Sequence, residues 1–239
     1  MILDVSIANQ LQRFSFLTYV IEVSAVMSAA LSGMMAARSK QMDLVGTYIV
    51  AFVNAFGGGT IRDVLLNRRP LFWVSNQEYP LLIFLLAVLF LYAPPLTQPN
   101  GYIAKPFFKV VDALGLALFS ISGTSYALSF QMPYFVASLI GVITGVFGGV
   151  LRDVLLAEIP MIFRTQTSLY ATCAFAGCWV FLGALVLGVQ PSIAAFCGFV
   201  VIVVFRMLSL RYRITLPLPR YLAEQQRRAN SAQPESDQA

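Results

Sequence analysis

The 239-residue sequence contains no histidine, and only 11% of its residues are charged. Histidine is the commonest general base near neutral pH and a frequent metal ligand, so its absence excludes histidine-based catalysis and zinc sites. The three cysteines, Cys173, Cys178 and Cys197, lie in apolar segments and form no CxxC pair. Isolated cysteines of this kind are typical of packing residues. Because no nucleophile–base set or metal cluster is apparent either, we expect neither an enzyme nor a resident cofactor.

The shortage of charge accompanies long apolar runs. Hydrophobic residues make up 58% of the chain and its mean hydropathy is +0.75, whereas a soluble domain carries roughly 25% charged residues. Apolar stretches recur between residues 14 and 210, and a helix that crosses a bilayer needs about 20 such residues. We therefore expect an all-α polytopic membrane protein. The net charge of +5 lies mostly beside the spans and in the C-terminal segment, so it indicates membrane topology and no nucleic-acid partner.

Hydropathy and turn residues divide the chain into seven predicted transmembrane helices. These helices cover residues 14–37, 43–67, 79–93, 107–130, 133–157, 167–187 and 190–210. The predicted units are an N-terminal segment, two groups of three helices, a seventh helix and a polar tail whose composition is typical of disorder. Their bounds are 1–13, 14–93, 104–187, 190–211 and 212–239.

Basic residues are distributed unevenly between the two sides of the membrane. One side is predicted to hold Arg38, Lys40, Lys105, Lys109, Arg164 and the tail arginines Arg206, Arg211, Arg213, Arg220, Arg227 and Arg228. The other side holds Arg13, Arg68 and Arg69. The positive-inside rule then predicts a cytoplasmic C-terminus and, because the number of spans is odd, an N-terminus outside.

One twelve-residue stretch occurs twice. Residues 55–66 read AFGGGTIRDVLL and residues 145–156 read GVFGGVLRDVLL, with seven identical positions at an offset of 90. The same offset relates Glu22 to Asp112, Ser32 to Ser122, Gly33 to Gly123 and Pro70 to Pro160. The first three helices therefore match the next three. A copy with three spans reverses the direction of the one that follows, which predicts a 3+3 inverted repeat plus a seventh helix.

The repeated motif begins with glycines, which are Gly57, Gly58 and Gly59 in the first copy and Gly148 and Gly149 in the second. Each costs about 1 kcal/mol relative to alanine inside a helix. One interpretation is that the glycines kink helices two and five at a site near the membrane midplane. The other is that they only allow helices to pack closely. A glycine run followed by Arg-Asp favours the kink.

The repeat also places charged residues within the spans, where each costs about 2.5–3.5 kcal/mol to insert. The charged candidates for a pathway or gate are Glu22, Arg62, Asp63, Asp112, Arg152 and Asp153. Matching depths predict an ion pair between Glu22 and Arg62 near the outer end and another between Asp112 and Arg152 near the inner end. Neither arginine is expected to pair with the aspartate that follows it, because side chains at i and i+1 point apart on a helix. Alternatively, both arginines snorkel to the membrane surface.

Three uncharged polar residues are candidates for lining the pathway. Asn54 and Thr144 occupy equivalent positions just before the glycines, and Thr60 follows them. The alternative for each is a hydrogen bond to its own helix backbone.

The two GG-x-x-R-D-V-L-L helices, in a three-plus-three arrangement with a seventh helix, resemble the prokaryotic branch of the TRIC family, the trimeric intracellular cation channels, over about residues 14–210. The resemblance implies a homotrimer in a bacterial inner membrane, with membrane lipids around it and one pore per protomer. It implies permeation by monovalent cations, chiefly K⁺ with Na⁺ possible, as the only bound ions. By motif match, the pore kinks lie at the glycines named above and the basic pore residues are Arg62 and Arg152.

The same family is also associated with glycine uptake, which keeps a second function open. An arginine near the positive end of a broken helix suits an amino-acid carboxylate, whereas a cation pore requires the arginines to be neutralised by Glu22 or Asp112 or to act as a gate. No TVGYG potassium-filter sequence occurs, so selectivity among cations is expected to be weak. A cation channel is the favoured function, and a secondary transporter for glycine or a similar small amino acid is the alternative.

Overall fold

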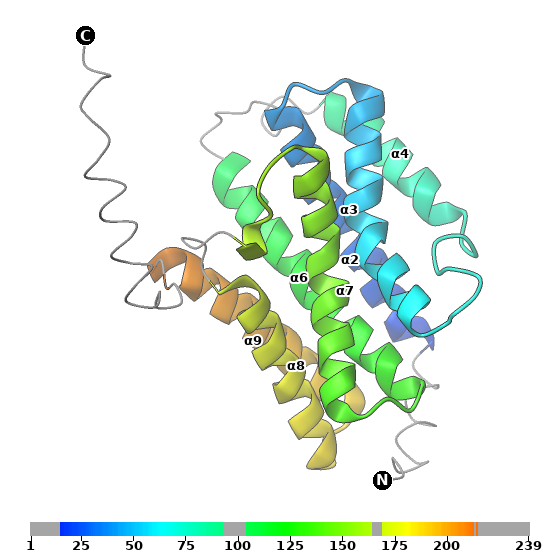
Figure 1. Cartoon of the computed structure of the whole chain (residues 1–239), viewed down its shortest axis with the longest axis vertical. Helices are drawn as coiled ribbons and strands as arrows, with labels where there is room; N and C mark the ends of the chain where they lie inside the picture. Colours follow the sequence, from blue (N-terminus) through cyan, green and yellow to red (C-terminus); the bar gives the residue numbers. More distant parts are fainter. Residues whose placement is uncertain (1–14, 93–103, 164–168, 213, 215–239) are drawn as a thin grey trace.

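The computed structural model describes residues 15–92, 104–163, 169–212 and 214. Within these residues all regular structure is helical, with seven α-helices and one 3-10 turn (Figure 1). The helices are α2 (Ser15–Ser39), α3 (Leu44–Leu65), α4 (Glu78–Leu91), α6 (Ala104–Ser129), α7 (Tyr134–Leu155), α8 (Tyr170–Val186) and α9 (Pro191–Tyr212), and the 3-10 turn is η1 (Met161–Phe163). Each of the seven predicted helices is therefore present.

Five helices, α2, α3, α6, α7 and α9, are long and apolar enough to cross a membrane. The other two are shorter, with 14 residues in α4 and 17 in α8, or about 21 and 26 Å at 1.5 Å per residue. The predicted N-terminal segment 1–13 lies outside the described residues, as do Arg164, the side chain of Lys105 and, apart from Tyr212 and Ile214, the predicted tail.

The ends of four helices have the same geometry at the 90-residue offset. Gln41 and Gln131, after α2 and α6, have φ of 56° and 58°, and Asn67 and Ala157, after α3 and α7, have φ of 51° and 54°. After each of these residues the next N–H donates to the carbonyl five positions back, at 2.7–3.3 Å. This is the Schellman arrangement, which satisfies free carbonyls at a helix end. The equivalent helices of the two halves thus end with the same backbone geometry.

α3 packs against α2, and α7 packs against α6. α3 and α7 cross at the centre of the bundle, where the two pairs meet (Figure 1). A Cβ added at Gly58 would overlap the carbonyl oxygen of Thr144, and one added at Gly148 would overlap the carbonyl oxygen of Asn54. Along this contact the residue number rises on α3 while it falls on α7, so the two helices are antiparallel. Their backbones touch because these positions have no side chain.

The glycines therefore allow close packing, as one of the two interpretations predicted. The helical assignment of α3 continues through Gly57, Gly58 and Gly59, and that of α7 continues through Gly148 and Gly149. The helices are thus not interrupted at the motif, and a bend there stays a prediction.

Candidate functional site

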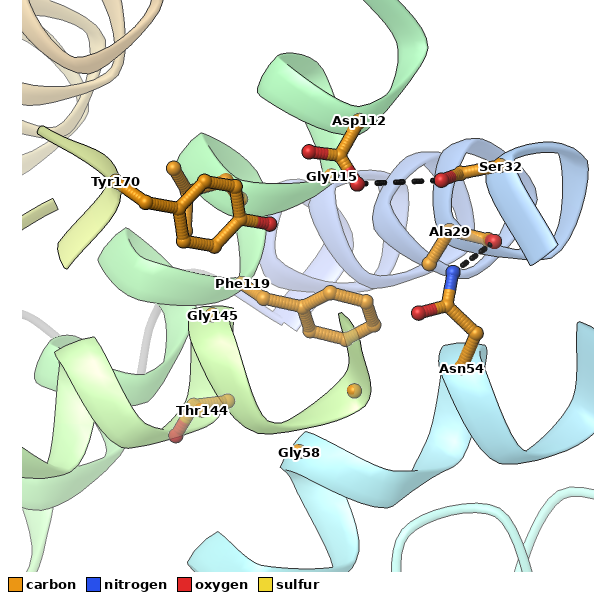
Figure 2. Close-up of a pocket in the computed structure, with 12 residues that line it drawn as sticks. Ala29, Ser32, Asn54, Gly58, Asp112, Gly115, Phe119, Thr144, Gly145 and Tyr170 are labelled. Carbon is orange, nitrogen blue, oxygen red and sulfur yellow. Dashed lines mark hydrogen bonds between the residues drawn. The ribbon is translucent and has the colours of Figure 1, made fainter. Parts of the chain in front are cut away.

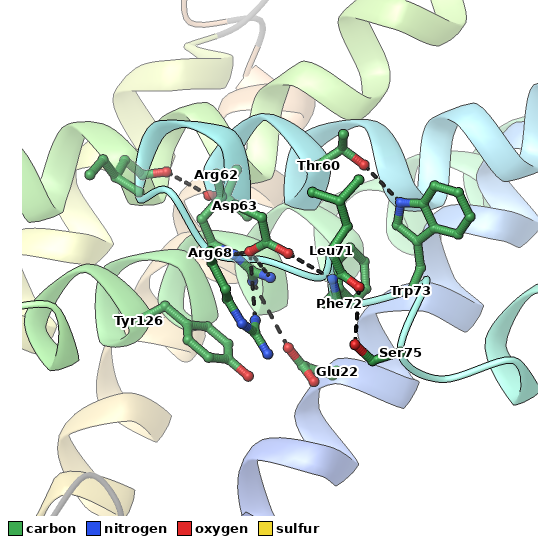
Figure 3. Close-up of polar contacts among 12 residues, drawn as sticks. Glu22, Thr60, Arg62, Asp63, Arg68, Leu71, Phe72, Trp73, Ser75 and Tyr126 are labelled. Atoms are coloured by element: carbon green, nitrogen blue, oxygen red, sulfur yellow. Dashed lines mark hydrogen bonds and ion pairs between the residues drawn. The ribbon is translucent and has the colours of Figure 1, made fainter.

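Two clusters of buried charge lie at the ends of α3 and α7. The Arg62 cluster consists of Glu22, Arg62, Asp63, Arg68, Phe72 and Tyr126 (Figure 3). Arg62 Nε donates to Asp63 Oδ1 at 2.8 Å, and Arg62 Nη2 lies 2.8 Å from the same oxygen. Arg62 Nη1 is 3.9 Å from Glu22 Oε1. The side chains of Arg62 and Asp63 are 1% and 0% exposed, so Arg62 does not snorkel to the surface of the described chain.

Aromatic rings cover the cations of this cluster. The guanidinium carbon of Arg62 lies 4.3 Å from the centroid of the Tyr126 ring and 5.2 Å from that of Phe72. Arg68, from the loop after α3, lies 4.6 Å from the Tyr126 centroid and its Nη1 is 3.6 Å from Asp63 Oδ1. Both arginines are thus within cation–π distance of one tyrosine.

The Arg152 cluster, which consists of Ser32, Phe108, Asp112, Arg152 and Asp153, repeats the pattern with tighter contacts. Arg152 Nε donates to Asp153 Oδ1 at 2.8 Å, and Nη1 donates to Asp112 Oδ1 at 3.0 Å and to Ser32 Oγ at 2.8 Å. Ser32 Oγ in turn donates to Asp112 at 3.2 Å. The Phe108 centroid is 5.3 Å from the guanidinium. A serine therefore bridges the ion pair in this cluster.

The predicted pairs Glu22–Arg62 and Asp112–Arg152 are confirmed, but the expectation about neighbouring residues is wrong. Each arginine makes its shortest charged contact with the aspartate that follows it, at 2.8 Å. Both Arg-Asp pairs lie in the last turn of a helix, and each arginine is long enough to reach the carboxylate of the next residue.

The two aspartates have a second task that the sequence did not reveal. Asp63 Oδ2 accepts a hydrogen bond from the Phe72 N–H at 2.8 Å, and Asp153 Oδ2 accepts one from the Met161 N–H at 3.0 Å. Each carboxylate therefore binds an arginine with one oxygen and the loop after its helix with the other. Asp63 and Asp153 couple the position of the loop to that of the guanidinium.

A small polar cavity of about 20 Å³ lies at the α3–α7 crossing, next to the Arg152 cluster (Figure 2). It is lined by Ala29, Ser32, Asn54, Gly58, Asp112, Gly115, Leu116, Phe119, Thr144, Gly145, Gly148 and Tyr170. Asn54 Nδ2 donates to the Ala29 carbonyl at 2.6 Å, which ties α3 to α2. Thr144 Oγ1 donates to the Ile140 carbonyl of its own helix at 2.6 Å.

The structure thus brings Asn54 and Thr144 to one cavity together with Asp112. Thr60 does not line this cavity. Its hydroxyl instead accepts a hydrogen bond from Trp73 Nε1 at 3.0 Å (Figure 3).

The two clusters lie at opposite ends of the crossing. Arg62 follows Gly58 by four residues and Arg152 follows Gly148 by four residues, and the helices are antiparallel. At 1.5 Å per residue each arginine is roughly 6 Å beyond its glycine. The cavity therefore lies between the Arg62 cluster at one end of the crossing and the Arg152 cluster at the other.

A third buried arginine was missed as a site residue. Arg206 was grouped with the tail arginines although the predicted helix 190–210 contains it. In α9 it is 2% exposed and has its guanidinium carbon 4.6 Å from the Tyr170 centroid. Tyr170, the first residue of α8, lines the polar cavity. An arginine inside a predicted span was the available signal, since such residues usually face a partner or a wet cavity.

Comparison with known proteins supports the arrangement. The family model described as "Glycine transporter" matches residues 19–95 and 109–186. A solved structure described as the TRIC trimeric intracellular cation channel orthologue from Rhodobacter sphaeroides is similar to this chain, with a TM-score of 0.76 and 32% identity, and covers 83% of this chain and 99% of that one. This chain belongs to the TRIC family. The second matched stretch begins 90 residues after the first, which is the offset of the repeated motif.

Curated relatives match this chain over most of its length. UPF0126 inner membrane protein YadS of Escherichia coli K12 is 35% identical over 202 residues, covering 84% of this chain and 95% of the relative. UPF0126 membrane protein of Vibrio cholerae is 35% identical over 201 residues, covering 84% and 82%. With the membrane-spanning helices of the described chain, these matches make it a multi-pass inner-membrane protein of the TRIC family.

Proposed function

We propose that this TRIC-family chain is a channel for monovalent cations, chiefly K⁺, with one pathway per protomer between α3 and α7. The observation that carries the proposal is the small polar cavity at the α3–α7 crossing, bracketed by the Arg62 and Arg152 clusters. The solved relatives described as cation channels support the same class of function.

The charge of the clusters suits a cation in spite of the arginines. Arg62 contacts Glu22 and Asp63, and Arg152 contacts Asp112 and Asp153. Each of these guanidinium groups therefore faces two carboxylates, and Arg68 beside Asp63 brings the net charge of the Arg62 cluster to zero. A guanidinium neutralised in this way is no electrostatic barrier to a cation.

The alternative is a secondary transporter for glycine or a similar small amino acid, which the description of the family model favours. An amino-acid carboxylate would have to compete with the carboxylates already bound, because Nε, Nη1 and Nη2 of Arg152 each contact an acceptor. Both arginines also lie in the last turn of a helix, where the helix dipole is negative and disfavours an anion. The geometry therefore supports the channel better.

We infer from the small cavity that the described conformation is closed. A volume of about 20 Å³ holds about one water molecule, which is too little for a hydrated cation. Conduction then requires α3 and α7 to separate at the crossing. Because a potassium-filter sequence is absent, we expect selectivity among monovalent cations to be weak.

Three further features belong to this proposal. The repeats are inverted, which the antiparallel α3–α7 contact supports, because an odd number of spans reverses the second copy. The Arg62 end then faces outside, and the C-terminus lies in the cytoplasm. The functional unit is a homotrimer, as the described relatives are, and native mass measurement of the purified protein counts its chains.

Reconstitution into liposomes tests the function directly. A channel gives discrete unitary K⁺ currents in planar-bilayer or patch recordings, and it takes up labelled glycine no faster than empty liposomes do. Saturable glycine uptake without unitary currents would instead establish the transporter. The Asp112→Asn variant serves as the matched control, because it should reduce whichever flux is specific to the pathway.

A further inference from the structure

Two small cavities share the ring of one tyrosine as a wall. The polar cavity at the α3–α7 crossing has a volume of about 20 Å³, and a second cavity beside the loop after α7 has about 10 Å³. Of the described residues, Tyr170 alone lines both. Figure 2 shows its ring projecting from the start of α8 toward the first cavity. The ring therefore separates two spaces, each of which holds at most about one water molecule.

The second cavity lies farther along α7 than the crossing. On this helix the first cavity is lined by residues as far as Gly148, and the second by residues as far as Asp153. Five residues of helix correspond to about 7.5 Å. The second cavity is also lined by the half-buried Ile162 of the loop, so it leads from the crossing toward the end of the bundle. A cation that leaves the crossing in this direction has to pass Tyr170.

An aromatic side chain faces the same motif glycine at each end of the crossing. Where α3 ends, a Cβ added at Gly59 would overlap the ring of Phe72. Where α7 ends, a Cβ added at the equivalent Gly149 would lie 3.6 Å from Tyr170 Oη, which is ordinary van der Waals contact. Tyr170 is thus less tightly packed against its glycine than Phe72 is.

The position of Tyr170 on its helix allows the ring to turn. Inside a helix the preceding turn restricts the χ1 rotamer of a long side chain. Tyr170 is the first residue of α8, so no preceding turn of that helix blocks it. In the described position the ring lies 4.6 Å from the guanidinium carbon of Arg206 on α9, which is a cation–π contact. A change of rotamer at this residue therefore moves the ring without interrupting α8.

We propose that the Tyr170 ring is a gate on the Arg152 side of the pathway. In the described position the ring closes the cavity at the crossing off from the second cavity. When the ring turns away, the two spaces join and a cation passes from one to the other. This proposal rests on the channel function above and adds a residue of α8 to it. Separation of α3 and α7 widens the crossing, whereas the ring controls entry to the crossing from one side.

The test is the rate at which silver ion, a monovalent cation that binds thiolate, reaches a cysteine at Thr144 from each side of the membrane. The native cysteines are replaced by alanine, and silver is added to one side at a time. Tyr170→Ala should raise the rate for Thr144→Cys at least tenfold, and from one side only. That side is identified by Ile162→Cys, which lies in the second cavity and should react from it equally fast with or without Tyr170→Ala.

Two controls separate a gate from packing. Tyr170→Phe keeps the ring and should leave the rate for Thr144→Cys within about twofold. Tyr79→Ala makes the same truncation near the start of α4, at a tyrosine that is 1% exposed and is not among the lining residues of either cavity, and it should not raise the rate. No acceleration by Tyr170→Ala, equal acceleration from both sides, or equal acceleration by either control would overturn the proposal.

A second variant covers the case in which Tyr170→Ala does not fold. Tyr170→Leu shortens the side chain but remains apolar, and it should still raise the rate about threefold or more; an unchanged rate would overturn the gate. The reaction can be followed by the loss of maleimide-reactive thiol, which requires no current. A wild-type protein without unitary K⁺ currents would therefore contradict the channel function, whereas a conducting protein in which the Tyr170 variants leave silver access unchanged would contradict the gate alone.

Discussion

Leucine at Gly58 or at Gly148 should lower potassium conductance at least tenfold, whereas leucine at Val64 or Val154 should leave it close to the wild-type value. The reason is the contact between backbones at the crossing. A side chain at Gly58 would overlap the Thr144 carbonyl oxygen, and one at Gly148 would overlap the Asn54 carbonyl oxygen. Backbone atoms cannot rotate away, and overpacking typically costs about 1–3 kcal/mol or more. The bulk also enters the cavity between α3 and α7.

The two valines are matched controls because they lie on the same helices beyond the glycines. Val64 is 52% exposed and Val154 is 58% exposed, so a larger side chain has room. Gly149→Ala is a second control, since its Cβ would lie 3.6 Å from the nearest atom, Tyr170 Oη. Unitary conductance and the size-exclusion profile should be measured together. Equal loss in all the leucine variants would show that the crossing has no special role.

The second large effect is expected from Asp112→Asn. Without this carboxylate Arg152 keeps its charge, because a guanidinium does not deprotonate in proteins. At an effective dielectric constant near 20, a unit charge 4 Å away is worth about 4 kcal/mol, which is an upper bound here because Asp153 remains. We expect K⁺ current to fall tenfold or more. Glu22→Gln should act in the same direction but less strongly, since Glu22 lies 3.9 Å from Arg62 and Asp112 lies 3.0 Å from Arg152.

Double variants separate the channel from the transporter. Asp112→Asn with Arg152→Gln, and Glu22→Gln with Arg62→Gln, should partly recover K⁺ current, because the unbalanced positive charge is removed with its partner. A glycine transporter predicts that either arginine substitution alone abolishes uptake and that the double variants are no better. If neither arginine substitution changes the flux of K⁺ or of glycine, both arginines are structural and the site assignment is wrong.

Much of the architecture could be predicted from one sequence because each feature of the first three helices occurs again in the next three. The depth of Glu22 in its span matched that of Arg62 in the next span, and the same match held for Asp112 and Arg152. Periodicity along a helix is enough for such an argument. The structure accordingly contains both ion pairs.

Two predictions failed because they considered a residue's position on its own helix and not the loops and helices packed against it. The rule that neighbours on a helix point apart overlooked that Arg62 lies in a last turn and that Asp63 is held by the Phe72 N–H. The path of that loop is not encoded in any periodic pattern. Arg206 was missed for a different reason, because its proximity to the end of a predicted span made a surface position the simplest reading. Only the packing of α9 and α8 brings it to Tyr170.

The central claim is that cations pass between α3 and α7 of one chain, and a cysteine at Thr144 tests it most directly. Thr144 lines the cavity, is 1% exposed and is close to cysteine in size. Silver ion is a monovalent cation that binds thiolate, a soft ligand. In a protein whose native cysteines are replaced by alanine, silver should irreversibly block the K⁺ current of Thr144→Cys and leave that of Val154→Cys unchanged. A conducting Thr144→Cys protein that silver does not block, or one blocked no more than Val154→Cys, would contradict a pathway at this crossing.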